Sequence, residues 1–120
     1  MRKYAYLWKN LLALCLVLLF VIPASLDFLA MRRDEPIVRT EALSRVLQLS
    51  DYAPGLKGTA LDTEVYVFDS GRPGGVFLVL GGTHPNESAA SLAAIAFIEN
   101  IKVQTGKVLV IPRTNRSAFS

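Results

Sequence analysis

One uncharged apolar segment near the amino terminus constrains this 120-residue chain more than any other feature. Residues 11–22 read LLALCLVLLFVI, and no charged residue occurs from Asn10 to Leu26. Three basic residues precede the segment, namely Arg2, Lys3 and Lys9. A basic start followed by an apolar run is typical of a secretory signal or a signal anchor. We therefore expect residues 1–30 to form an anchor or transmembrane helix and to take no part in a soluble core.

The apolar segment has the length of a short membrane span, since roughly 20 residues cross a bilayer core. The sequence Ile22-Pro23-Ala24 is a weak cleavage site, so we expect an uncleaved anchor. A cleaved signal and a buried soluble helix are the alternatives. The basic amino end predicts a cytoplasmic amino terminus with the following domain outside the cytoplasm; the alternative is export after cleavage. The single cysteine, Cys15, lies inside the segment, where a small apolar role is expected.

The formal charge of +3 comes from the amino-terminal part of the chain. Residues 1–33 carry five Lys or Arg and one Asp, whereas residues 34–120 carry eight Lys or Arg and nine Asp or Glu. The part after the anchor is therefore close to neutral and has no basic stripe. We expect no nucleic-acid partner.

The rest of the chain divides into two regions by composition. Residues 31–58 read as a juxtamembrane linker, with a short amphipathic helix expected over residues 40–49 because apolar side chains recur there at helical spacing. Pro54-Gly55 then marks a turn. Residues 59–120 read as the first part of an α/β domain.

Alternating and continuous apolar runs predict three strands in this α/β region, at residues 62–69, 76–80 and 108–111. We expect the first two to be antiparallel neighbours because a short turn joins them. The uninterrupted apolar character of residues 76–80 predicts burial on both faces. Residues 88–104 are alanine-rich and helical in pattern, so the last two strands with this helix predict a right-handed βαβ unit with parallel strands.

The loop between residues 80 and 88 contains the candidate functional residues of the chain. It reads Gly81-Gly82-Thr83-His84-Pro85-Asn86-Glu87 and holds the only histidine of the chain. Open α/β sheets bind ligands at the carboxyl ends of their strands, where this loop should lie. A histidine at a strand end and a glutamate at a helix start can close on one metal ion, so we expect His84 and Glu87 to be metal ligands. A loop histidine and an ordinary first-turn glutamate are the alternative interpretation.

A family resemblance extends this interpretation. Residues 76–119 resemble the succinylglutamate desuccinylase/aspartoacylase family of zinc carboxypeptidase-like hydrolases, which has a buried strand, a Gly-Gly-x-His-Gly-x-Glu loop, an Ala-rich helix and another strand. Four residues match the loop, and Pro85 replaces a glycine; the matches are Gly81, Gly82, His84 and Glu87. The resemblance implies the start of a mixed three-layer α/β/α sheet, with His84 and Glu87 as the first two ligands of one zinc ion.

The resemblance also covers the residues after the last strand. Family members commonly have an Asn-Pro-x-Ala turn there; Asn115 and Ala118 match it, while Arg116 replaces the proline. Asn115, Arg113 and Arg116 are therefore candidate substrate-binding residues, with a solvated loop as the alternative for the two arginines.

The resemblance implies an enzyme that uses zinc to hydrolyse an amide, or an ester, of a small-molecule or peptide-like substrate with an acyl-amide bond. The family's second histidine, its general-base glutamate and its arginines have no counterpart here, so no catalytic residue is expected within this chain. We expect an amino-terminal portion of a longer enzyme, inactive alone. The alternative is a non-catalytic, membrane-tethered binding or regulatory module with the same fold start.

Overall fold

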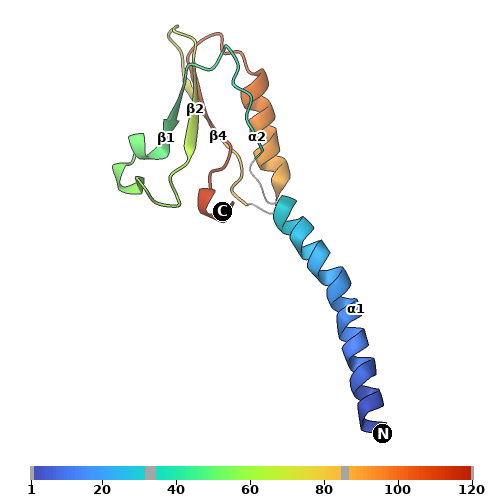
Figure 1. Ribbon diagram of the computed structural model, residues 1–120. Helices are drawn as coiled ribbons and strands as arrows, with labels where there is room; N and C mark the ends of the chain where they lie inside the picture. Colours follow the sequence, from blue (N-terminus) through green and yellow to red (C-terminus); the bar gives the residue numbers. More distant parts are fainter. Residues whose placement is uncertain (1, 32–34, 85–86, 120) are drawn as a thin grey trace. The chain divides into compact units, whose positions relative to one another are not determined.

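A computed structural model describes residues 2–31, 35–84 and 87–119, which form two compact units, Met1–Asp34 and Glu35–Ser120. The first unit is the helix α1, Arg2–Met31, and the second contains a four-stranded sheet (Figure 1).

Helix α1 is the only helix in the described part of the chain that is long and apolar enough to cross a membrane. The qualifying segment is Tyr6–Ala30, and all its side chains are exposed. Pro23 lies inside the helix; proline is tolerated in membrane helices more readily than in soluble ones. A signal sequence near the amino terminus meets the same criteria of length and composition. The helix is therefore long and apolar enough for a membrane span or a signal sequence, and the orientation of the chain stays a prediction.

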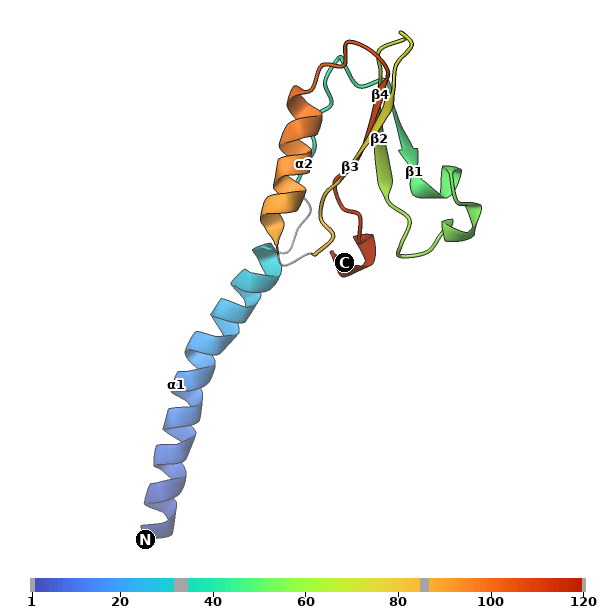
Figure 2. The same ribbon diagram turned by 180° about the vertical axis from the view of Figure 1, so that it is seen from behind.

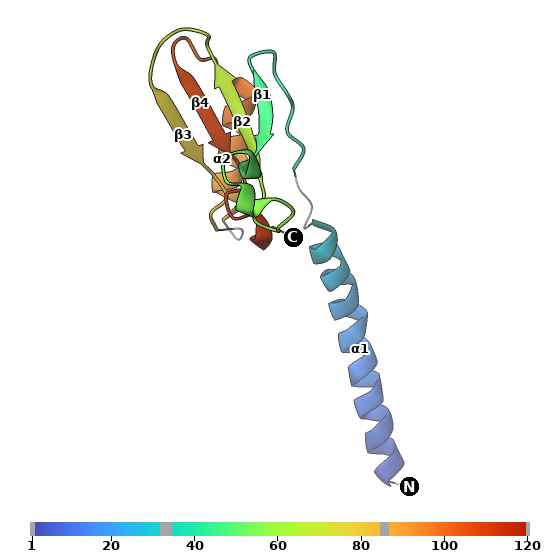
Figure 3. The ribbon, with the colours of Figure 1, turned by 90° about the vertical axis from the view of Figure 1, so that its left-hand side faces the viewer.

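The second unit is built on one mixed sheet with the strand order β1-β2-β4-β3 (Figure 3). The four strands are β1, Arg45–Gln48; β2, Glu64–Asp69; β3, Val76–Leu80; and β4, Lys107–Ile111. Strands β1 and β2 are antiparallel, as are β2 and β4, whereas β3 and β4 are parallel. The three strands expected from the sequence are thus confirmed in type and position, and the sheet has a fourth.

That fourth strand replaces a predicted helix, since the amphipathic helix expected over residues 40–49 is wrong. Residues 45–48 pair with β2, and the Ser44 amide donates to the carbonyl of Val67 at 3.0 Å. Val46 packs on one face of the sheet and Leu47 on the other. The segment with helical apolar spacing is too short to specify a helix by itself. Pairing with β2 satisfies the backbone hydrogen bonds of this segment instead.

The expected pairing of β2 with β3 is also wrong. Strand β4 lies between them and pairs with both, with Val110 opposite Tyr66 of β2 and opposite Val79 of β3. The short turn between β2 and β3 does reverse the chain direction, but β4 lies between these two strands in the sheet. The parallel pairing of β3 and β4 around a helix confirms the predicted βαβ unit.

Strand β3 lies at the edge of the described sheet, and among the described residues its expected burial on both faces is wrong. Val76 is 70% exposed and Leu78 is 52% exposed; Phe77 and Leu80 are exposed as well. Its neighbour β4 covers only one edge of the strand. The strand therefore combines the composition of a central strand with the position of an edge strand.

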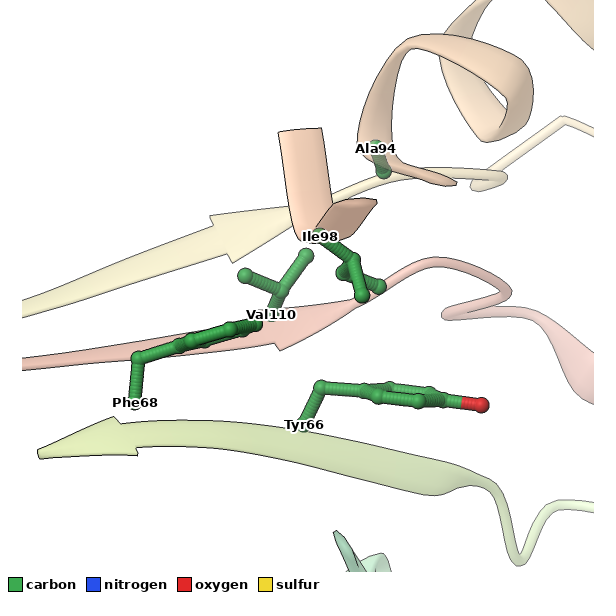
Figure 4. Close-up of a cluster of buried hydrophobic side chains, with 5 residues drawn as sticks. All are labelled: Tyr66, Phe68, Ala94, Ile98 and Val110. Carbon is green, nitrogen blue, oxygen red and sulfur yellow. The ribbon is translucent and has the colours of Figure 1, made fainter. Parts of the chain in front are cut away.

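Helix α2, Ser88–Asn100, covers one face of the sheet (Figure 2). Its buried side chains pack on aromatic and β-branched side chains of β2 and β4 (Figure 4); the cluster comprises Tyr66, Phe68, Ala94, Ile98 and Val110. Residues of the segment before β1, among them Ile37 and Leu43, pack against the same cluster. A smaller cluster lies on the other face and contains Val65, Val67 and Ile111. The core thus holds α2 against β2 and β4.

Candidate functional site

The loop with His84 leaves the carboxyl end of β3, beside the carboxyl end of its parallel neighbour β4. The Gly81 amide donates to the carbonyl of Ile111 at 2.8 Å, which extends the parallel pairing into the loop. His84 and Glu87 are both exposed, and the Glu87 amide donates to the carbonyl of His84 at 3.1 Å. The structure therefore brings the two predicted ligands into one turn at the sheet end where α/β proteins bind ligands.

Glu87 is the N-cap residue immediately before α2, and its side chain makes no capping hydrogen bond. A carboxylate at this position is favoured by the positive end of the helix dipole. Pro85, which replaces the glycine of the family loop, and Asn86 lie outside the described residues. The Glu87 carboxylate is not used to cap the helix.

The two glycines of the loop are required by close packing. A Cβ on Gly81 would lie 2.6 Å from the Cβ of Ala94 and 2.8 Å from the carbonyl oxygen of Ala90. Gly82 has a φ of +61°, and a Cβ there would lie 2.7 Å from the carbonyl oxygen of Pro112. Gly81 lets α2 approach the loop, and Gly82 makes the left-handed turn that carries the chain towards His84.

Asn115 lies against the same loop. The Thr114 amide donates to the carbonyl of Gly81 at 2.9 Å, and the Asn115 amide donates to the carbonyl of Gly82 at 3.2 Å. The Asn115 side chain donates from Nδ2 to the carbonyl of Thr83 at 3.4 Å, and its Oδ1 accepts from the Ser117 hydroxyl. The segments after β3 and β4 are therefore hydrogen-bonded into one unit that carries both His84 and Asn115.

The two candidate arginines have different surroundings. Arg113 is only 8% exposed, and its Nη2 donates to the carbonyl of Glu35 at 2.6 Å. Arg116 is half-buried at the start of a short 3₁₀ helix, Arg116–Ala118. Arg113 thus has a partner within the chain, and a substrate contact by either arginine stays a prediction.

A polar pair that the sequence analysis did not identify lies at the same end of the sheet. The Tyr66 hydroxyl donates to Oε2 of Glu64 at 2.7 Å. Burial raises the pKa of Tyr66 well above its usual range, and the hydrogen bond and negative charge of Glu64 raise it further, while the charges of Arg113 and Arg39 act in the opposite direction. The sequence contains a signal for this pair, because Glu64 and Tyr66 are two residues apart in a predicted strand and such residues lie on one face of the sheet.

Among the described residues, this loop has two side chains of the types that bind metals, those of His84 and Glu87. No group of three or more His, Cys, Asp or Glu side chains in the described part of the chain is arranged to hold a metal ion. A zinc site in a hydrolase has three protein ligands and an open position. His84 and Glu87 have the right donor atoms for two of those ligands, so the loop fits part of such a site.

Comparisons of the chain with family models, with curated proteins and with solved structures returned no match. The resemblance in the loop and in the segment after β4 therefore rests on the residues themselves.

Proposed function

We propose that this chain carries the first two ligands of the zinc site of a membrane-anchored or exported hydrolase of the desuccinylase/aspartoacylase type. The observation that supports the proposal best is the turn that joins His84 to Glu87 through a backbone hydrogen bond at the carboxyl ends of β3 and β4. The substrate class is an acyl-amide, or an ester, of an amino-acid-like compound.

In this proposal His84 contributes a ring nitrogen and Glu87 contributes a carboxylate oxygen to one zinc ion. When bound, zinc supplies Lewis-acid activation of a water molecule near neutral pH. Asn115 holds the loop through the carbonyl of Thr83 and presents its amide at the same sheet end. A third ligand and a general base are also needed, and the proposal places them in polypeptide beyond these residues, so this portion alone is inactive.

The exposed edge strand supports the idea that the sheet is larger. The carbonyl of Gly75 accepts from Lys107, and the amide of Gly81 donates to Ile111, so the odd-numbered residues of β3 face β4. The amides and carbonyls of Val76, Leu78 and Leu80 consequently point away from it. Such an apolar edge is a template for another strand. We propose that further strands of the same enzyme cover it and complete a three-layer, zinc carboxypeptidase-like fold.

One observation favours a second candidate function. Two ligands are fewer than a catalytic zinc site uses. A membrane-tethered binding or regulatory module would keep the fold of residues 35–119 without catalysis. A third ligand in the native polypeptide favours the enzyme, and its absence favours the module.

Zinc content tests the proposed ligands. In the native polypeptide extracted from membranes, we expect about one zinc per chain, and we expect His84→Ala and Glu87→Ala each to reduce it by more than about tenfold. The measurement is mass spectrometry of the metal in the purified protein. Glu41→Ala removes an exposed carboxylate outside the loop and should leave zinc unchanged. Stoichiometric zinc that survives both loop substitutions would contradict the assignment.

Carbonate extraction tests the anchor. We expect the uncleaved protein to stay with the membrane pellet at alkaline pH, because the 25 residues of Tyr6–Ala30 can span the bilayer core. Immunoblotting of pellet and supernatant with an amino-terminal tag measures the result. Release of uncleaved protein into the supernatant would rule the anchor out.

A further inference from the structure

Arg113 is a charged residue in an almost fully buried position, and all the contacts described for it lie within the chain. Its guanidinium donates to the carbonyl of Glu35, the first described residue after α1. Its own carbonyl accepts from the hydroxyl of Thr63, which is buried too. Burying a charge is unfavourable unless it is hydrogen-bonded, so these contacts hold Arg113 in one position.

The segment 35–38 is held at two points. Besides the bond from Arg113 to Glu35, the Val38 amide donates to Oε1 of Glu99 on α2 at 3.0 Å. Between these points, Ile37 packs against the main core cluster. The chain after α1 is thus fastened to the domain before it reaches β1.

The loop that follows Arg113 is held to the loop of His84. The amides of Thr114 and Asn115 donate to the carbonyls of Gly81 and Gly82. The Cα of Arg113 would lie 3.1 Å from a Cβ on Gly82, so the two backbones are in close contact. One residue therefore contacts the segment 35–38 through its side chain and the candidate site through its backbone.

We infer that Arg113 is a positioning residue that links the segment leaving the apolar helix to the loop pair of the candidate site. The carbonyl of Glu35 fixes the guanidinium, and the fixed guanidinium sets the start of residues 113–115. Those residues in turn hold the carbonyls of Gly81 to Thr83. For zinc binding, this inference rests on the proposed function; for the linkage of the two segments, it does not.

Hydrogen exchange measured by mass spectrometry tests the linkage in the full chain in detergent micelles. In Arg113→Met, which keeps the aliphatic stem and removes the donors, we expect amide exchange at least tenfold faster at Val38 and at residues 114–115. Residues 66–68 and 109–111 should keep their wild-type rates. Arg113→Lys keeps a charged donor and should restore part of the protection, and it serves as the test if Arg113→Met does not fold.

Glu99→Ala is the matched control, because it releases Val38 without touching Arg113. We expect faster exchange at Val38 and wild-type protection at residues 114–115. Faster exchange in Arg113→Met at Val38 alone, equally across the sheet, or nowhere would overturn the inference.

Zinc affinity of the native polypeptide separates this inference from the proposed function. We expect Arg113→Met to weaken zinc binding by about tenfold, as is typical when the support of a ligand loop is lost. A wild-type protein that binds no zinc would refute the proposed function and leave the exchange result intact. A wild-type protein that binds zinc, with unchanged affinity in Arg113→Met, would refute the positioning role.

Discussion

Replacing Gly81 by alanine is expected to lower the free energy of unfolding by about 1–2 kcal/mol and to reduce bound zinc in the native polypeptide. The added Cβ would lie 2.6 Å from the Cβ of Ala94 and 2.8 Å from the carbonyl oxygen of Ala90. Overpacking of this kind costs about 1–3 kcal/mol or more, which exceeds the 0.4–1 kcal/mol that alanine gains over glycine in the unfolded chain. Because α2 must move away from the loop, Glu87 at the N-cap of α2 moves with it.

Urea denaturation followed by circular dichroism measures the stability, and mass spectrometry measures the metal. Gly75→Ala is the matched control, since a Cβ there meets nothing within 4 Å. A Gly81→Ala protein as stable as Gly75→Ala would show that α2 does not pack as closely on the loop as described.

The sequence predicted the type and position of the elements in the α/β region better than it predicted which strands pair in the sheet. The continuous apolar residues at 76–80 and 108–111 identify two strands, and the alanine-rich pattern between them identifies a helix. This order of elements predicted the parallel βαβ unit. The position of β4 between β2 and β3 depends on pairing over a long sequence separation, which local patterns do not encode. The same limit explains β1, whose short segment became a strand because β2 offered it backbone partners.

The candidate site was predicted in a similar way. His84 and Glu87 could be selected because glycines, a histidine and a glutamate follow an apolar strand at fixed spacing. The contact of Asn115 with the loop follows from the parallel pairing of β3 and β4. The contact between Arg113 and Glu35 joins residues 78 positions apart, so sequence alone suggested a substrate contact and missed the partner that the structure describes.

The second large expected effect is on stability and concerns the edge strand β3. In the polypeptide as cells produce it, we expect Leu78→Ala to lower the free energy of unfolding by about 2–4 kcal/mol, because the proposed function requires further strands to bury β3. In the part of the chain described here Leu78 is 52% exposed. If Leu78 is equally exposed in the native protein, Leu78→Ala removes little buried apolar surface. The free energy of unfolding then falls by less than about 1 kcal/mol. Proteolysis in graded urea after extraction from membranes measures the difference.

Two further variants calibrate this measurement. Phe68→Ala should lower the free energy of unfolding by about 3–5 kcal/mol in either case, because Phe68 is fully buried beneath α2. Leu61→Ala removes a leucine of similar exposure outside the strands, at 49%, and should change stability by no more than about 0.5 kcal/mol. A Leu78→Ala value close to that of Phe68→Ala would mean that β3 is an inner strand, as its sequence predicts. A value close to that of Leu61→Ala would mean that the sheet ends at β3, which contradicts the proposed enzyme and favours the membrane-tethered module.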